Sequence, residues 1–354
     1  MISLVDIKNI LHDPSPESTE QLAQNASRLT RQYFGRTITL YAPLYLSNFC
    51  SSHCIYCGFH SHNRIKRFKL TAEQMHQEMS FLAKQGIENV LLLTGESYQA
   101  TPLDYLKEAA TIAKTHFSNI SMEVHPMDEE EYRELFAHGV DGITVYQETY
   151  NRKHYKEVHV SGKKADYDYR FGTPERAAKG GIRHISLGIL LGLADPAGDL
   201  HALYQHLHWM ERHYPGVEYS VSFPRLRAIK GTDFASSPQG AFGQGEPTGY
   251  CDVDDITLVK IICLTRIQFP RIGINLSTRE DAGLRDHALE LGITRISAGS
   301  NTSVGGYTVT SAEKQDPQFD IKDHRSVKDV ISILKNRNFD PVLTDWRSIS
   351  NEID

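Results

Sequence analysis

The amino-acid sequence predicts an α/β fold, a (β/α)8 TIM-type barrel with an N-terminal helical cap and a C-terminal extension. Short apolar runs of strand type alternate with helical patterns along most of the chain, and eight such runs can be counted. Alternation of this kind is typical of parallel βαβ units, and eight units close into a barrel. An open doubly wound sheet is the alternative. It is less favoured, because the first run is not followed by the glycine-rich motif of a dinucleotide-binding sheet.

Each expected strand is a short apolar segment bounded by polar or turn-forming residues. In chain order the expected strands are Thr37–Leu46, Asn89–Thr94, Ser121–Val124, Gly142–Tyr146, His184–Gly188, Glu218–Ser222, Gly273–Ser277 and Thr294–Ser297.

The expected helices begin at residues that favour helix starts. Thr71 with Gln74 fits a capping box, and Thr101 can cap a helix whose first turn holds Pro102. The stretch between the fourth strand and Thr173 is expected to be a long polar loop. The expected barrel helices are Thr71–Gln85, one from Thr101-Pro102, Asp128–His138, one from Thr173, Asp199–Arg212, Asp254–Gln268 and Asp281–Leu291.

We divide the chain into three parts. Residues 1–36 are expected to form an N-terminal helical segment, residues 37–304 the barrel, and residues 305–354 the extension, with one more helix at Ser326–Asn336. The extension is expected to lie near the mouth of the barrel or to plug it.

Composition and charge exclude several classes of protein. With 354 residues, of which 40% are hydrophobic and 23% charged, the chain has the balance of a globular enzyme rather than of a disordered protein. The net charge of −6 argues against nucleic acid as the main partner. No apolar run is long enough to span a membrane, and the N-terminus lacks the pattern of a signal peptide, so we expect a cytoplasmic protein without a membrane partner.

Three of the five cysteines are crowded directly after the first expected strand, as Cys50-x3-Cys54-x2-Cys57. Thiolates at this spacing can hold one metal ion or one iron–sulfur cluster, whereas an odd, clustered set does not suit a disulfide framework. A structural zinc site needs a fourth ligand. Three nearby histidines could supply it: His53, His60 or His62. Spacing alone does not decide between zinc and iron–sulfur.

The position of the cysteines favours a reactive site. Three thiolates around a four-iron cluster leave one iron without a protein ligand, and that iron is open to a substrate or cofactor. In a (β/α)8 barrel the chemistry lies at the carboxyl ends of the strands. Charged and hydroxyl residues follow most of the expected strands here, so an active site is expected at this end.

The segment CSSHCIYC, with Tyr56 before the last cysteine, resembles the signature of radical S-adenosylmethionine (SAM) enzymes. This resemblance implies a [4Fe-4S] cluster on the three cysteines. The open iron would chelate SAM, an electron from the cluster would break the sulfonium bond, and a 5′-deoxyadenosyl radical would form. Tyr56 is then expected to lie against the adenine, with plain core packing as its alternative role.

Other cofactor-binding residues follow from the same resemblance. Thr94-Gly95-Glu96 resembles the GGE-type segment of the superfamily, which bonds the methionine amino group of SAM. Glu148 and Arg170 resemble the pair that holds the ribose or methionine end of SAM. A surface ion pair is the alternative for these two residues.

Several further segments are similar to a single family within this superfamily: YCGFHSHNRIKR, LLLTGE, VYQETYN, SFPRLR, LSTRE and ISAGSNTSVGGY. That family is 2-iminoacetate synthase, the tyrosine lyase of bacterial thiamine-thiazole biosynthesis. The similarity runs from about residue 33 to Asp345-Trp346. It implies cleavage of the Cα–Cβ bond of L-tyrosine to 2-iminoacetate (dehydroglycine) and p-cresol, with 5′-deoxyadenosine and methionine as the other products.

The substrate and partners can also be assigned as expectations. Arg279 follows the seventh strand, and its planar guanidinium suits the carboxylate of an amino acid. Ser277, Ser297 and Ser300 could add donors at the same end of the substrate, although turn or cap chemistry is an alternative for each. The resemblance implies two protein partners, a thiazole synthase that takes the product and a flavodoxin-type or ferredoxin-type electron donor.

Three other functions compete with this interpretation. The tyrosine lyase of [FeFe]-hydrogenase maturation shares most of the motifs, but it carries a C-terminal domain with cysteines for a second cluster, and no cysteine follows Cys263 here. A tryptophan lyase is a more distant possibility. A zinc-stabilised barrel that serves as a binding protein is the alternative that is not an enzyme.

His125, in the segment EVHP, stands where the family is expected to have glutamine.

Overall fold

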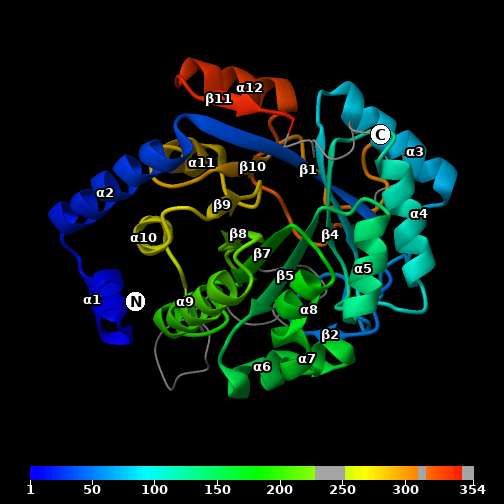
Figure 1. Ribbon diagram of the computed structural model, residues 1–354, viewed down its shortest axis with the longest axis horizontal. Coiled ribbons are helices and arrows are strands. Elements are labelled where there is room, and N and C mark those ends of the chain that lie inside the picture. The colour runs from blue at the N-terminus through cyan, green and yellow to red at the C-terminus, as the bar shows by residue number, and fades with distance from the viewer. Residues whose placement is uncertain (228–251, 310–315, 345–354) are drawn as a thin grey trace.

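The computed structural model describes residues 1–227, 252–309 and 316–344, and eight parallel strands in these ranges close into a barrel (Figure 1). Pairing of β10 with β1, through Thr39–Tyr41 and Arg295–Ser297, closes the ring. The predicted barrel is therefore confirmed. The barrel strands are β1 (Thr37–Ser47), β3 (Asn89–Thr94), β4 (Asn119–Glu123), β5 (Gly142–Glu148), β7 (His184–Ile189), β8 (Glu218–Ser222), β9 (Gly273–Leu276) and β10 (Arg295–Ser297).

Helices connect the barrel strands and cover their outer side (Figure 1). Most of them begin at a residue whose side chain accepts a hydrogen bond from the first turn, as Thr71 does for α3. The helices on the barrel are α3 (Ala72–Lys84), α4 (Leu103–Ala113), α5 (Glu129–Ala137), α6 (Arg152–Val158), α7 (Tyr167–Phe171), α8 (Thr173–Lys179), α9 (Pro196–His213), α10 (Asp255–Gln268) and α11 (Ala282–Ala288).

Two details of the predicted helices are wrong. Thr101 does not cap α4: its hydroxyl donates to the carbonyl of Ser97, and Pro102 occupies the N-cap position without a side-chain bond. The stretch expected to be a long polar loop holds α6, α7, a 3-10 turn at Lys163–Ala165 and β6 (His159–Ser161). Asn151 and Asp166 cap the two helices, but each helix is too short to produce a clear periodic pattern.

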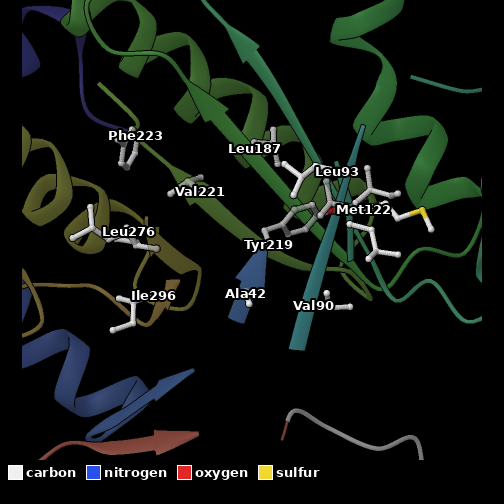
Figure 2. Packing of buried hydrophobic residues seen from close by; sticks show 14 of the residues in the cluster. Ala42, Val90, Leu93, Met122, Leu187, Tyr219, Val221, Phe223, Leu276 and Ile296 are labelled. Carbon is white, nitrogen blue, oxygen red and sulfur yellow. The ribbon is translucent and has the colours of Figure 1, made fainter. Parts of the chain in front are cut away.

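The core is built by the alternation of side chains along the strands. On β1, Leu40, Ala42 and Leu44 are fully buried in the apolar core, whereas the intervening Tyr41 and Pro43 line a cavity inside the barrel. Figure 2 shows how buried hydrophobic side chains of several strands pack, among them Ala42 of β1 and Ile296 of β10. The cavity in the barrel is lined by polar, aromatic and aliphatic side chains that can meet a ligand.

The two ends of the chain flank the barrel. Helix α1 (Leu4–His12) packs against α9, and α2 (Pro16–Phe34) packs against α10. In the C-terminal part, α12 (Val327–Asn336) precedes β11 (Asp340–Val342), which pairs in parallel with Thr37–Thr39 at the beginning of β1 (Figure 1). None of the described helices has the length and apolar character needed to cross a membrane.

The extension also reaches the opposite end of the barrel. Glu78 of α3 is fully buried and accepts hydrogen bonds from the backbone nitrogens of Tyr307, Thr308 and Val309 at 3.0, 2.6 and 2.9 Å. Beyond this anchor, Gln318 and Phe319 line the barrel cavity. Residues 318–319 therefore border the mouth of the barrel, whereas β11 extends the sheet beside the beginning of β1.

Candidate active site

A cavity of about 960 Å3, counting the part open to solvent, lies inside the barrel where the strands end. Seven of the predicted site residues line it: Tyr56, Cys57, Glu148, Ser277, Arg279, Ser297 and Ser300. The others lie in the cysteine loop, in the segment after β3 and on α7. The carboxyl ends of the strands therefore bring the predicted residues to one site, as expected for this fold.

The three cysteines lie on one loop that follows β1. Cys54 belongs to β2 (His53–Cys54), which pairs with β6, and the backbone nitrogen of Cys57 donates to the carbonyl of Cys54 at 3.1 Å. Burial raises the pKa of Cys50 to about 11, and the neighbouring Cys57 adds to the rise. Buried thiols that raise one another's pKa become thiolates readily only when a cation neutralises them. The donor set therefore fits a metal centre.

Close packing of backbones explains the glycine in the segment after β3. A Cβ atom at Gly95 would lie 2.4 Å from the carbonyl oxygen of Phe49, which no rotamer change can relieve. The backbone nitrogen of Gly95 donates to Ser47, and that of Ser51 donates to the carbonyl of Glu96, both at 2.9 Å. The segment Thr94–Glu96 is thus bound directly to the loop that carries the cysteines.

A buried network of charges connects that segment to the next strands. Arg170, on α7, donates to Glu96 at 2.7 Å and to the carbonyl of Tyr146 at 2.6 Å. Glu148 accepts from Lys164 at 2.8 Å, and Lys164 lies 3.8 Å from Glu96. Arg170 and Glu148 are 6% and 7% exposed, so the surface ion pair is excluded. The two residues share one network through different partners.

Glu148 has an unusual backbone conformation. Its φ angle is +69°, in the left-handed region that residues other than glycine rarely adopt. The pairing of β5 with β7 shifts register between Tyr146 and Glu148. Strained residues and bulges of this kind persist mainly where a side chain must be aimed at a functional site. The bulge directs the carboxylate of Glu148 to Lys164 at the cavity wall.

Tyr56 is held by hydrogen bonds that involve His159. The Nδ1 atom of His159 is 2.8 Å from the carbonyl of Tyr155 and therefore carries the proton, so the hydroxyl of Tyr56 donates to Nε2 of His159 at 2.7 Å. With the hydroxyl tied down and the side chain 7% exposed, Tyr56 offers its ring to the cavity. Both its expected roles, ligand contact and packing, are compatible with this position.

Arg279 also lines the cavity. Its guanidinium stacks on Phe319 at 3.8 Å from the ring centre and donates through Nη1 to the carbonyl of Arg225 at 3.1 Å. Its Nε atom is buried and has no hydrogen-bond partner among the described residues. An unpaired buried donor is costly unless a ligand satisfies it. The arrangement suits a carboxylate placed on Arg279.

The three serines near Arg279 differ in their bonding. Ser297 accepts from the backbone of Thr278 at 3.0 Å, and Ser277 accepts from that of Arg279 at 3.4 Å. The hydroxyl of Ser300 is buried without a partner among the described residues. Turn chemistry therefore engages two of the serines, and Ser300 keeps its full hydrogen-bonding capacity for a ligand.

Sequence reasoning missed three residues of the site. Burial lowers the pKa of Lys164, but the carboxylates of Glu148 and Glu96 outweigh burial and raise that pKa above its usual value. Burial, and then the charge of Glu148, raise the pKa of Glu123 to about 7. Gln318 donates to Cys57 at 3.9 Å and accepts from a tyrosine hydroxyl at 2.7 Å. Lys164 and Gln318 stand in no recognisable motif, and Glu123 opens the segment EVHP, in which the sequence singles out only His125.

Unpaired buried atoms also indicate where the cofactors fit. Oγ1 of Thr94 and Oε2 of Glu96 are buried and have no hydrogen-bond partner in the part of the chain that the structure describes. Both stand beside the cysteine loop, on the segment predicted to bind the amino group of SAM. The three thiols and these two acceptors therefore fit a cluster with SAM next to it.

Comparison with known proteins identifies the class. Residues 44–207 match the model of the Radical SAM superfamily, and residues 222–340 match that of the Biotin and Thiamin Synthesis associated domain. A crystal structure of HydG, a maturase of the [FeFe]-hydrogenase, superimposes with a TM-score of 0.87 at 29% identity, covering 97% of this chain and 73% of that one. The chain is a radical SAM enzyme, and its cofactors are a [4Fe-4S] cluster and SAM.

Two relatives define the family more closely. The 2-iminoacetate synthase of Salmonella typhimurium is 40% identical over 348 residues, which cover 98% of this chain and 88% of that protein. The 2-iminoacetate synthase of Escherichia coli is 40% identical over 344 residues, covering 97% of this chain and 87% of the relative. The chain belongs to the 2-iminoacetate synthase family.

Proposed function

We propose that this chain cleaves the Cα–Cβ bond of L-tyrosine to 2-iminoacetate and p-cresol, for the thiazole of thiamine. One observation carries the proposal: a single cavity is lined both by Cys57 of the three-cysteine loop and by Arg279, whose buried Nε lacks a partner among the described residues. A carbon–carbon lyase that acts on an amino acid needs both groups, and the family relationship supports the choice of tyrosine.

We assign the first wall of the cavity to the cofactors. Cys50, Cys54 and Cys57 would hold the cluster, and Glu96 would accept from the amino group of SAM through its unpaired oxygen. When bound, the cluster and SAM supply the electron and the 5′-deoxyadenosyl group that removes a hydrogen atom from the substrate. Tyr56 would lie against the adenine, since its hydroxyl is already engaged and its ring faces the cavity.

The buried network would hold the remainder of SAM. Thr94 offers an unpaired hydroxyl oxygen beside Gly95, whose lack of a side chain lets the two loops touch. Glu148 and Arg170 are fixed by their ion pairs to Lys164 and to the carboxylate of the preceding segment. A network already satisfied by protein groups costs little further ordering when the cofactor binds.

We assign the second wall to tyrosine. Arg279 would bind the carboxylate, with Ser300 as an added donor and Ser277 and Ser297 supporting the turn from which Arg279 projects. This placement would direct the amino group toward the cofactor wall, as hydrogen abstraction at nitrogen requires. Glu123, with a pKa of about 7, is available in the same cavity to accept a proton from the phenol or the amino group.

The partners are part of the proposal. The product imine is conjugated to a carboxylate and hydrolyses readily in water, so we propose direct transfer to a thiazole synthase. We further propose a flavodoxin-type or ferredoxin-type electron donor and a cytoplasmic location, where thiols stay reduced for cluster assembly. Co-purification with the thiazole synthase, and a thiazole yield that an added imine trap does not lower, would support transfer. A yield that falls with the trap, with no complex, would argue against it.

Anaerobic turnover with different amino acids tests the choice of substrate. With SAM and a reductant, L-tyrosine should give p-cresol and glyoxylate, the hydrolysis product of the imine. Phenylalanine should react poorly, because it lacks the phenol that stabilises the departing fragment. Preferential turnover of tryptophan would instead support the tryptophan-lyase alternative, and stoichiometric zinc without iron would support the zinc-stabilised barrel.

A further inference from the structure

Three histidines that no function above uses lie beside the cysteine loop. His53, His60 and His62 each offer one ring nitrogen, and these three atoms lie within 4.8 Å of one another. The ring centres of His53 and His62 are 4.2 Å apart, and those of His53 and His60 are 5.0 Å apart. The three imidazoles thus form one compact group.

The backbone on both sides of this group is fixed. His53 belongs to β2 and pairs with Ser161 of β6. The backbone nitrogen of Ser61 donates to the carbonyl of Ser52 at 2.9 Å, which joins the segment of His60 and His62 to that of His53. A guanidinium nitrogen of Arg67 donates to the carbonyl of His60 at 2.7 Å. The histidines are therefore held close together by hydrogen bonds that do not require a metal.

A hydrogen bond can hold the ring of His62 in place. Its Nδ1 atom is 3.2 Å from the hydroxyl of Ser61, and when Nδ1 carries the proton and donates to that oxygen, the lone pair of Nε2 is available for a cation. Hydrogen bonding at one ring nitrogen commonly fixes the other for metal binding. His60 is 4% exposed, whereas His62 is exposed. The buried His60 would thus bind a cation from the interior, and the exposed His62 would leave the ion accessible to solvent.

We propose that His53, His60 and His62 form a second metal site, for Zn2+ or a similar borderline divalent cation, separate from the iron–sulfur cluster. Three neutral imidazoles without a carboxylate suit such ions better than Mg2+ or Ca2+. Zinc–nitrogen bonds of about 2.0–2.1 Å require the ligand atoms to approach to roughly 3.4 Å. The three ring nitrogens, now within 4.8 Å of one another, would close to that separation around the ion, and water would complete the fourth position.

The site would brace the cluster loop. His53 directly precedes Cys54, and His60 and His62 follow Cys57 by three and five residues. A cation on the three histidines therefore joins the two ends of the segment that contains both cysteines. The proposal does not depend on which amino acid the enzyme cleaves.

Zinc analysis of the cluster-loaded enzyme tests the site. The cluster is assembled first and SAM added, so that the three cysteines are occupied when Zn2+ is supplied. After desalting we expect one zinc per chain in addition to about four irons. X-ray absorption at the zinc edge should show nitrogen neighbours at about 2.0–2.1 Å and no sulfur at about 2.3 Å.

Matched variants locate the ion. Loss of a residue that only hydrogen-bonds to a metal ligand typically weakens metal binding about 10–100-fold. His62→Gln and His60→Gln each remove a ligand itself, so zinc binding should weaken by at least about 100-fold while the iron content stays unchanged. His76→Gln removes a histidine from an exposed pair with His116, whose ring nitrogens are 3.1 Å apart, and should leave the zinc content unchanged. Zinc–sulfur scattering, no bound zinc, or equal zinc in His62→Gln would overturn the proposal.

Discussion

Replacement of Arg279 by alanine should impair the use of tyrosine far more than the binding of SAM. In the structure this guanidinium is stacked on Phe319, is bonded to one carbonyl, and keeps its Nε without a partner among the described residues. A hydrogen bond to a charged group contributes about 1.5–3 kcal/mol. A loss of about 3 kcal/mol on removing the carboxylate ligand corresponds to roughly 100-fold weaker tyrosine binding.

The effect on SAM should be small, because Arg279 bonds to the carbonyl of Arg225 and stacks on Phe319, and among the described residues it forms no hydrogen bond or ion pair with the residues assigned to SAM. We expect the dissociation constant of SAM to change by less than about 3-fold. Arg279→Lys keeps the charge but loses the planar fork and the stacking on Phe319, so its KM for tyrosine should rise about 10-fold.

The assay measures the KM for tyrosine from p-cresol formation and the affinity for SAM by equilibrium binding on the same cluster-loaded preparations. Arg227→Ala serves as the control, because Arg227 bonds to Glu280 at 3.0 Å but does not line the cavity. Iron content and unfolding temperature verify that each variant is intact. A normal KM for tyrosine in Arg279→Ala would remove this residue from the substrate site.

Three further changes follow from the structure. Cys54→Ala should contain no iron after cluster assembly, whereas Cys263→Ala, on the buried face of α10, should contain as much iron as the wild type. Iron analysis of both variants tests this, and iron bound by Cys54→Ala would show that Cys54 is not a cluster ligand. Glu78→Ala should destabilise the protein by about 3 kcal/mol, because it removes the buried carboxylate that accepts three backbone hydrogen bonds. Glu73→Ala, exposed on the same helix, should have little effect in denaturant unfolding. Because the pKa of Glu123 rises from 4.5 to about 7 on folding, the free energy of unfolding of the wild type should fall as the pH rises from 4.5 to 7 and this carboxyl ionises. Glu123→Gln should have the stability of the wild type near pH 4.5 and be more stable by at most about 3 kcal/mol above pH 7. A stability difference that does not vary with pH would contradict the raised pKa.

Much of the fold could be predicted because its signals are local. The strands at Asn89–Thr94 and Glu218–Ser222 match the structure at both ends, and the Thr71–Gln74 capping box is present. At Thr101 the predicted helix cap is wrong, because its hydroxyl donates to the carbonyl of Ser97 instead of accepting from the first turn of the helix. A preference for a capping position does not reveal such tertiary alternatives.

The site could be predicted only where residues belong to motifs. Cys57, Glu148 and Arg279 follow strands or stand in recognisable segments, and all three line the cavity. Lys164 lies in a short turn, and its place in the site is set by tertiary contacts, such as the 3.2 Å bond from its backbone nitrogen to the hydroxyl of Ser52. Gln318 reaches the site from the C-terminal part of the chain, more than 250 residues after the cysteine it contacts. Cys251, which stands apart from the cysteine cluster in the sequence, and the Asp345-Trp346 segment lie outside the described residues.

Carbon labelling tests the central claim most directly. L-tyrosine carrying carbon-13 at both Cα and Cβ is incubated anaerobically with the cluster-loaded enzyme, SAM and a reductant, and the products are separated and analysed by mass. Cleavage of the Cα–Cβ bond predicts one label in glyoxylate, from the hydrolysed imine, and one in the methyl group of p-cresol, with an equal amount of 5′-deoxyadenosine. Both labels in a single product, or 5′-deoxyadenosine formed without p-cresol, would contradict the assignment of this chain as a tyrosine lyase.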